Sequence, residues 1–121
     1  MTTQNLKMVR GDTKVFTATV TLNGVAVNLT GGTLRLTAKW SPFDADGAAA
    51  FQLSSPSDGI VLTTPTSGIA TITITAAKTT GLPNKLSNLF YDLQFTDSAS
   101  KPYTVSYGRI LILPEISITT P

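Results

Sequence analysis

Carboxylates are the side chains of this sequence whose spacing comes nearest to a chemical site. Asp44 and Asp46 stand two positions apart and precede Gly47, as in the opening of a calcium-binding loop. Asp58 is close enough along the chain to join them after a turn. An EF-hand loop would place a glutamate at its twelfth position, where this chain has Ser55. Asp44, Asp46 and Asp58 are therefore a calcium candidate, but we expect a solvated acidic turn.

Catalytic chemistry has few other sources in this chain. It contains no cysteine and no histidine, which excludes disulfides, Cys/His zinc sites, a cysteine nucleophile and a Ser-His-Asp triad. Asp92 lies in an alternating segment, and a lone strand aspartate usually faces solvent or a cross-strand cation. Ser41 and Ser87 lack a lysine at a spacing that would single out a pair. We expect no catalytic residue, no cofactor and no enzyme activity.

Two short motifs have a functional and an ordinary interpretation. Arg10-Gly11-Asp12 spells the tripeptide that integrins bind, but a Gly-Asp bend leading into a strand is the simpler interpretation. Asn28-Leu29-Thr30 is formally an N-glycosylation sequon. We interpret Asn28 as a strand-end residue before the Gly31-Gly32 turn.

Charge and hydropathy exclude further classes. Of 121 residues only 13% are charged, about half the usual share, and the net charge is +2. The nine basic residues are scattered rather than clustered, which argues against nucleic-acid binding. No apolar run reaches the about 18 residues of a membrane helix. The first residues lack the basic and apolar regions of a signal peptide, so we expect synthesis in a cytoplasm and no membrane partner.

One aromatic corner could bind a sugar. Trp40 and Phe43 are three positions apart, near Arg35 and Lys39. Their rings could stack on a pyranose. Trp40 is in phase with the apolar positions Leu34 and Leu36, however, and we expect it in the core.

The elements that must position these residues are strands. Phe16, Ala18, Val20 and Leu22 alternate with polar residues, which predicts one strand over 15–22. Asn23-Gly24 then predicts a type I′ turn, after which the chain reverses into a hairpin strand at Val25–Val27. Further strands are expected at 33–40, 50–53, 60–63, 70–75, 89–96, 103–107 and 109–113, with one helical turn at 76–80 and a bulge or bend at Gly108.

This many short strands separated by turns predicts an all-β fold. About seven to nine strands are typical of a single antiparallel β-sandwich. We expect one domain over residues 1–121, with a core from about 5 to 113 and an extended tail at 114–121. Threonine, the residue in excess, would coat the outer faces of the strands.

Several short motifs, in order, resemble a known family. They are Val9-Arg10-Gly11-Asp12, Asn23-Gly24-Val25-Ala26-Val27-Asn28-Leu29-Thr30-Gly31, Leu34-Arg35-Leu36-Thr37-Ala38-Lys39, Ser57-Asp58-Gly59-Ile60, Gly68-Ile69-Ala70-Thr71-Ile72, Phe90-Tyr91-Asp92-Leu93-Gln94 and Tyr107-Gly108-Arg109-Ile110. Nearly the whole chain is similar to the immunoglobulin-like β-sandwich at the N-terminus of phage baseplate upper proteins and in related small tail and virion proteins.

The resemblance implies a non-enzymatic structural component of a phage tail, baseplate or other virion part. Its partners would be other virion proteins and copies of itself, and its location the virion after synthesis in the bacterial cytoplasm. The candidate assembly residues are Trp40, Phe43, Ile116 and Ile118, because exposed apolar side chains and strand edges seek partners. The alternative is a carbohydrate-binding or adhesive sandwich that uses Trp40 and Phe43.

Overall fold

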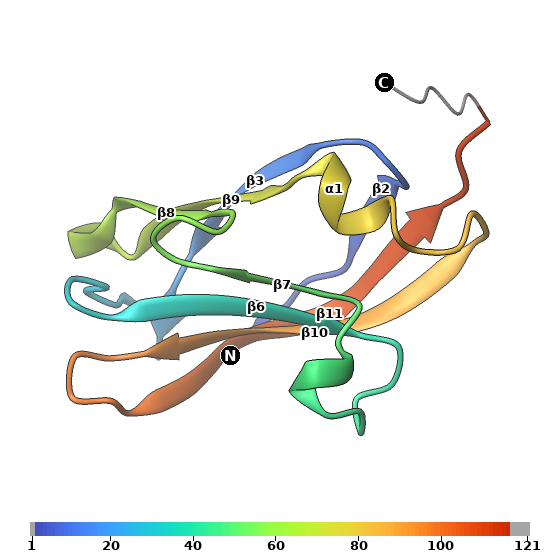
Figure 1. Ribbon diagram of the computed structural model, residues 1–121. Coiled ribbons are helices and arrows are strands. Elements are labelled where there is room, and N and C mark those ends of the chain that lie inside the picture. Colours follow the sequence, from blue (N-terminus) through green and yellow to red (C-terminus); the bar gives the residue numbers. More distant parts are fainter. Residues whose placement is uncertain (1, 117–121) are drawn as a thin grey trace.

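Two β-sheets pack face to face in the computed structural model, which describes residues 2–116 (Figure 1). The larger sheet has the order β1-β11-β10-β6-β7, with β2 also paired to β11. Its strands are β1 (Thr2–Thr3), β2 (Leu6–Val9), β6 (Thr33–Lys39), β7 (Phe51–Ser54), β10 (Ser87–Thr96) and β11 (Pro102–Leu113). The smaller sheet has the order β3-β9-β8 and consists of β3 (Lys14–Thr19), β8 (Ile60–Thr64) and β9 (Ile69–Ile74). The expected all-β sandwich-like fold is confirmed.

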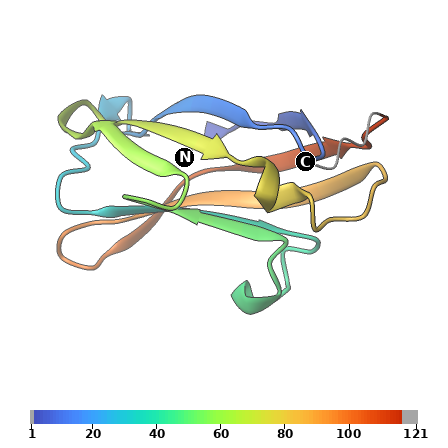
Figure 2. The same ribbon diagram turned by 45° about the horizontal axis from the view of Figure 1, so that its top comes forward.

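Short elements connect these strands. They are the hairpin strands β4 (Thr21–Leu22) and β5 (Val25–Ala26), the 3₁₀ turns η1 (Asp46–Ala48) and η2 (Pro65–Ser67), and the helical turn α1 (Ala76–Thr79). The loop that carries η1 projects from the outer side of the larger sheet, away from the smaller one (Figure 2). None of the helices in the described part of the chain is long and apolar enough to cross a membrane.

The core lies between the inner faces of the two sheets. Alternation puts every second side chain there, as in β9, where Ala70, Ile72 and Ile74 are fully buried. Leu36 on β6 and Leu93 on β10 face them from the larger sheet. The other completely buried side chains of the core include Leu29, Leu34, Ala38, Leu53, Ile60, Leu89, Ile110 and Ile112. Burial of this apolar surface is the main driving force of the fold.

The hairpin after β3 is confirmed, but the strand before it is shorter than expected. Asn23 and Gly24 both have positive φ angles, 53° and 78°, as a type I′ turn requires. In the smaller sheet, β3 ends at Thr19. The backbone N–H of the next residue, Val20, donates to the carbonyl of Gly68, which lies before β9. Leu22, which the alternation places in phase with Phe16 and Val20, is exposed because β4 and β5 form a separate two-stranded sheet.

One edge of the larger sheet departs from a purely antiparallel sandwich. Both β1 and β2 run parallel to β11, whereas the other pairs of the two sheets are antiparallel. The residues predicted as two strands around Gly108 form the single strand β11. Its register shift relative to β10 falls between Leu93 and Gln94, so a bulge at Gly108 is wrong. Gly108 instead meets the N-terminal segment, since a Cβ there would lie 2.1 Å from the Gln4 carbonyl oxygen.

Candidate functional site

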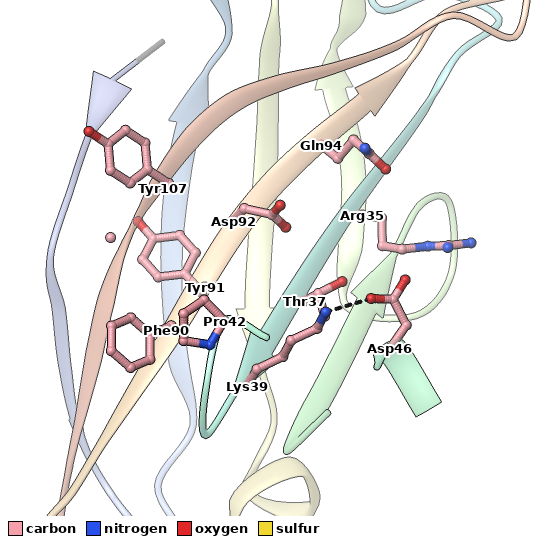
Figure 3. A pocket seen from close by; sticks show the side chains of 11 residues that line it. Arg35, Thr37, Lys39, Pro42, Asp46, Phe90, Tyr91, Asp92, Gln94 and Tyr107 are labelled. Atoms are coloured by element: carbon pink, nitrogen blue, oxygen red, sulfur yellow. Dashed lines mark ion pairs between the residues drawn. The ribbon is translucent and has the colours of Figure 1, made fainter. Parts of the chain in front are cut away.

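The outer face of the larger sheet contains a hollow of about 340 Å³ (Figure 3). Its floor comes from the middle strands β6, β10 and β11, and the loop after β6 supplies one side. The residues that line it are Arg35, Thr37, Lys39, Pro42, Asp46, Phe90, Tyr91, Asp92, Gln94, Tyr107 and Gly108. This is the candidate site, and we call it the Asp92 hollow.

Strand alternation and register bring these side chains together. On β10, Phe90, Asp92 and Gln94 are two residues apart and share the outer face. The register places Asp92 between Thr37 of β6 and Tyr107 of β11. Residues directly opposite one another in paired strands have Cβ atoms roughly 5 Å apart. Three segments distant in sequence therefore form one polar cluster around Asp92, at the centre of the view in Figure 3.

Asp92 is half-buried, and its carboxylate takes part in no hydrogen bond or ion pair with the described residues. Burial raises the pKa of this carboxyl above its ordinary value of 3.8, because removal from water disfavours the charged form. The positive charge of Lys39 lowers the pKa in part, and the negative charge of Asp46 adds to the rise. Asp92 is therefore a carboxylate that has lost water and gains no hydrogen-bond donor from the part of the chain that the structure describes.

Lys39 is engaged by the loop rather than by Asp92. Its Nζ lies 2.8 Å from Asp46 Oδ1 and donates to the backbone carbonyl of Asp44, also at 2.8 Å. The hydrogen bond and charge of Lys39 lower the pKa of the Asp46 carboxyl. Lys39 thus fixes the loop at the side of the hollow.

Aromatic rings border the other side. The guanidinium of Arg109 lies 4.7 Å from the centre of the Phe90 ring, a cation–π distance. Tyr107 is partly exposed, and Pro42 contributes an apolar surface from the loop. Tyr91, from the inner face, donates its hydroxyl to the Gln4 carbonyl, and burial raises its pKa. The hollow therefore combines an apolar wall with a polar floor.

The three calcium candidates do not converge. Asp44 accepts a hydrogen bond from the Ser41 backbone N–H at 3.2 Å, Asp46 pairs with Lys39, and Asp58 pairs with Lys78 at 3.1 Å. No group of three or more potential metal-binding side chains occurs in residues 2–116. A lysine partner makes Asp46 and Asp58 poor calcium ligands, and Asp44 stabilises its own turn as an acidic turn residue does.

The aromatic corner lies outside the Asp92 hollow. Phe43 is 94% exposed and Trp40 39% exposed, and neither lines the hollow, although Pro42 between them does. The expectation of a core Trp40 is wrong. β6 ends at Lys39, so Trp40 lies past the last residue that pairs with β10 and the sheet does not cover it. Ile116 is 98% exposed, and Ile118 lies outside the described residues.

Arg10 holds three chain segments together. Its Nε donates to the Leu82 carbonyl at 2.7 Å, and its terminal nitrogens contact the Thr80 carbonyl and the Glu115 carboxylate. Gly11 has a φ of 83°, which confirms the bend. With its guanidinium committed in this way, Arg10 is not presented to an integrin.

Asn28 also has a local structural role. Its Oδ1 accepts a hydrogen bond from the Thr30 backbone N–H at 3.0 Å, the geometry of an Asx turn. The sequence predicts a strand end at Asn28, but β5 ends at Ala26 and Asn28 lies in the loop that follows, where this contact gives it a role in a turn.

A second surface, on the smaller sheet, has the opposite character. Its outward positions carry only uncharged, β-branched side chains: Val15, Thr17, Thr19, Val61, Thr63, Ile69, Thr71 and Thr73. Val15 and Val61 are 60% and 56% exposed. The hydroxyls of Thr63 and Thr71 lie 2.6 Å apart. We call this surface the threonine–valine face.

The sequence predicts that Asp92 faces solvent or a cross-strand cation; it does lie on the outer face, but it is half-buried and forms no ion pair within the described residues, and the hollow around it was not predicted. The signal was present in the alternation of Phe90, Asp92 and Gln94 on one face. The register with β6 and β11, which encloses Asp92, could not be inferred from one strand. Comparison of the chain with models of known protein families and with curated protein sequences finds no match.

Proposed function

We propose that this protein is a non-enzymatic structural component of a bacteriophage particle, acting through protein–protein assembly. Its motifs resemble those of phage tail and virion sandwiches. The strand order supports the immunoglobulin-like form of that proposal. The sheets β3-β9-β8 and β11-β10-β6-β7 correspond to B-E-D and G-F-C-C′ of an immunoglobulin-type sandwich. Synthesis in the host cytoplasm and location in the virion belong to the same proposal.

The observation that carries assembly is the threonine–valine face. The exposed face of a sheet in a monomeric protein ordinarily carries Lys, Glu or Asp side chains, and these charges prevent unwanted association. Here the outward side chains of a whole sheet are neutral, and two valines among them are more than half exposed. β-branched side chains are stiff, so little rotamer entropy is lost when they are covered. This surface is suited to burial against another protein.

The occupant we propose is a second copy of this chain. An isologous contact places one surface against itself across a two-fold axis, so a residue close to the axis meets its own copy and a charge there would meet its own sign. The threonine–valine face carries no charge to repel its copy. Threonine hydroxyls can donate and accept, which lets identical faces form hydrogen bonds with each other.

Sedimentation velocity over a range of protein concentrations tests this function. We expect a discrete dimer for the wild type and a shift to monomer for Thr17→Lys, since the lysine of each copy would be buried at a contact that supplies no opposite charge. Thr104→Lys, an exposed threonine on the larger sheet, is the matched control and should assemble as the wild type does. A wild type that remains monomeric at all concentrations, or equal effects of both lysines, would exclude assembly through this face.

A second candidate function, carbohydrate binding, is favoured by the exposure of Trp40 and Phe43. If Trp40→Ala abolished retention of the protein on a glycan array, the aromatic corner would be the binding site. Retention unchanged by that substitution would exclude it.

A further inference from the structure

The Asp92 hollow has the dimensions of a ligand site. Its volume of about 340 Å³ lies within the roughly 300–1,000 Å³ of small-molecule sites. It is formed mainly by strands that are paired on both sides, β6, β10 and β11. Side chains on such strands hold their positions better than side chains on loops.

The chemistry of a ligand follows first from Asp92. A half-buried carboxylate has up to four acceptor positions, and the described residues supply no donor to any of them. Leaving a desolvated acceptor unpaired is costly. A ligand that brings hydrogen-bond donors to this position would recover that cost.

The surrounding charges decide between ionic and neutral ligands. Arg35 and Lys39 balance Asp46 and Asp92, so the lining has no net charge. Lys39 is paired with Asp46, whereas Arg35 donates no hydrogen bond within the described residues. A cation bound at Asp92 would also meet the charges of Arg35 and Lys39, and an anion bound at Arg35 would meet that of Asp92. A neutral ligand whose groups both donate and accept hydrogen bonds can pair with the acceptor Asp92 and with the donor Arg35. Hydroxyl is the simplest such group.

The wall of the hollow gives the shape of that ligand. Phe90, Tyr107 and Pro42 present apolar surface beside the polar floor. A pyranose ring has the same division, with C–H groups on its faces and hydroxyls at its edge. Its C–H face can pack on an aromatic ring while its hydroxyls point at Asp92 and Gln94.

We propose that the Asp92 hollow binds a neutral saccharide, with Asp92 accepting hydrogen bonds from two hydroxyls of one pyranose ring packed beside Tyr107. Gln94, two residues along β10 from Asp92, and Thr37, opposite Asp92 on β6, donate to or accept from neighbouring hydroxyls. The site is distinct from the Trp40–Phe43 corner and does not rest on assembly through the threonine–valine face.

The test is an NMR titration of ¹⁵N-labelled protein with the methyl glycosides of glucose, galactose, mannose and N-acetylglucosamine. The Thr17→Lys background keeps binding separate from self-association. We expect at least one glycoside to shift the amide resonances of Thr37, Asp92 and Tyr107. Asp92→Asn should weaken that binding by roughly tenfold or more, the value of a charge-assisted hydrogen bond. Asp12→Asn, an exposed aspartate in the turn before β3, is the matched control and should bind as the parent does.

Three results would overturn the proposal. The first is the absence of shifts with all four glycosides at tens of millimolar. The second is binding of Nα-acetyl-lysine amide with the same dependence on Asp92, which would make the hollow a site for a cationic side chain of a partner. The third is a glycoside response that is lost in Trp40→Ala and kept in Asp92→Asn, which would place binding at the aromatic corner.

Discussion

At the scale of single residues, two side chains stand apart from the charge-poor surface. Asp92 is partly desolvated and receives no hydrogen bond from residues 2–116, and Arg10 is surrounded by acceptors from segments 70 and more positions away. The unpaired carboxylate of Asp92 lowers the stability of the free protein and is available to bind a ligand. The contacts of Arg10 stabilise the fold. Their substitutions should therefore act in opposite directions on the free energy of unfolding.

Asp92→Asn should stabilise the free protein at neutral pH. The folded-state pKa of Asp92 is raised above its unfolded value of 3.8, so the native state binds the proton more tightly. The free energy of unfolding therefore falls as the pH rises from 3.8 through the folded-state pKa. Asparagine carries no charge, so the free energy of unfolding of the variant does not fall over this pH range. Urea denaturation of both proteins should show a gain for Asp92→Asn at pH 7 that vanishes below about pH 3, where both forms are neutral. A loss of stability at pH 7 would show that the carboxylate has a stabilising partner.

Arg10→Ala should lower the free energy of unfolding by about 2 kcal/mol, since charge-assisted hydrogen bonds of partly buried groups are lost. Arg10 and Glu115 side chains are only 17% and 13% exposed. Arg10→Lys should recover only part of the loss, because an ammonium cannot reach several acceptors in the planar geometry of a guanidinium. Arg109→Ala, which removes a cation stacked on Phe90, is the control and should cost about 0.5–1 kcal/mol. Denaturant unfolding measures all three, and equal losses for Arg10→Ala and Arg109→Ala would contradict this role.

At the scale of elements, strand positions could be predicted and strand partners could not. The two-residue period located β6, β9 and β10 because each is half-buried, with one face in the core. The parallel pairing of β1 and β2 with β11 joins residues about 100 positions apart, and no local pattern reports such a contact. Trp40 is a second case in which the local pattern was insufficient. It is in phase with the inward residues Leu34 and Leu36, but β6 ends one residue earlier, at Lys39.

Gly108 is the residue on which the parallel edge most depends. The Gln4 backbone N–H donates to the Tyr107 carbonyl at 3.0 Å, and the Gln4 carbonyl lies where a Cβ of residue 108 would be. Gly108→Ala should detach β1 and lower the free energy of unfolding by about 2 kcal/mol. Gly47→Ala, at a position with open space for a Cβ, should change it by less than about 1 kcal/mol. Denaturant unfolding and exchange of the Gln4 amide hydrogen provide the measurement. An unchanged Gln4 exchange rate in Gly108→Ala would show that the edge does not need glycine.

At the scale of the whole molecule, the two outer faces of the sandwich differ in chemistry. The larger sheet presents charges, aromatic rings and the Asp92 hollow, whereas the threonine–valine face is neutral. The low charge and abundant threonine of the sequence predicted that threonine side chains cover the outer faces of the strands. Which sheet would carry the charges depended on how strands distributed between the sheets, and therefore on tertiary pairing. In our two proposals, the threonine–valine face serves assembly and the Asp92 hollow on the opposite sheet binds a ligand.

Cysteine cross-linking tests assembly through the threonine–valine face most directly. The natural chain has no cysteine, so a single introduced thiol reports one contact. Thr17→Cys and Thr71→Cys lie on that face, and Thr104→Cys lies on the other sheet. We predict that mild oxidation gives covalent dimers with Thr17→Cys or Thr71→Cys, and monomer with Thr104→Cys. Dimers formed only by Thr104→Cys, or to the same extent by all three variants, would contradict it.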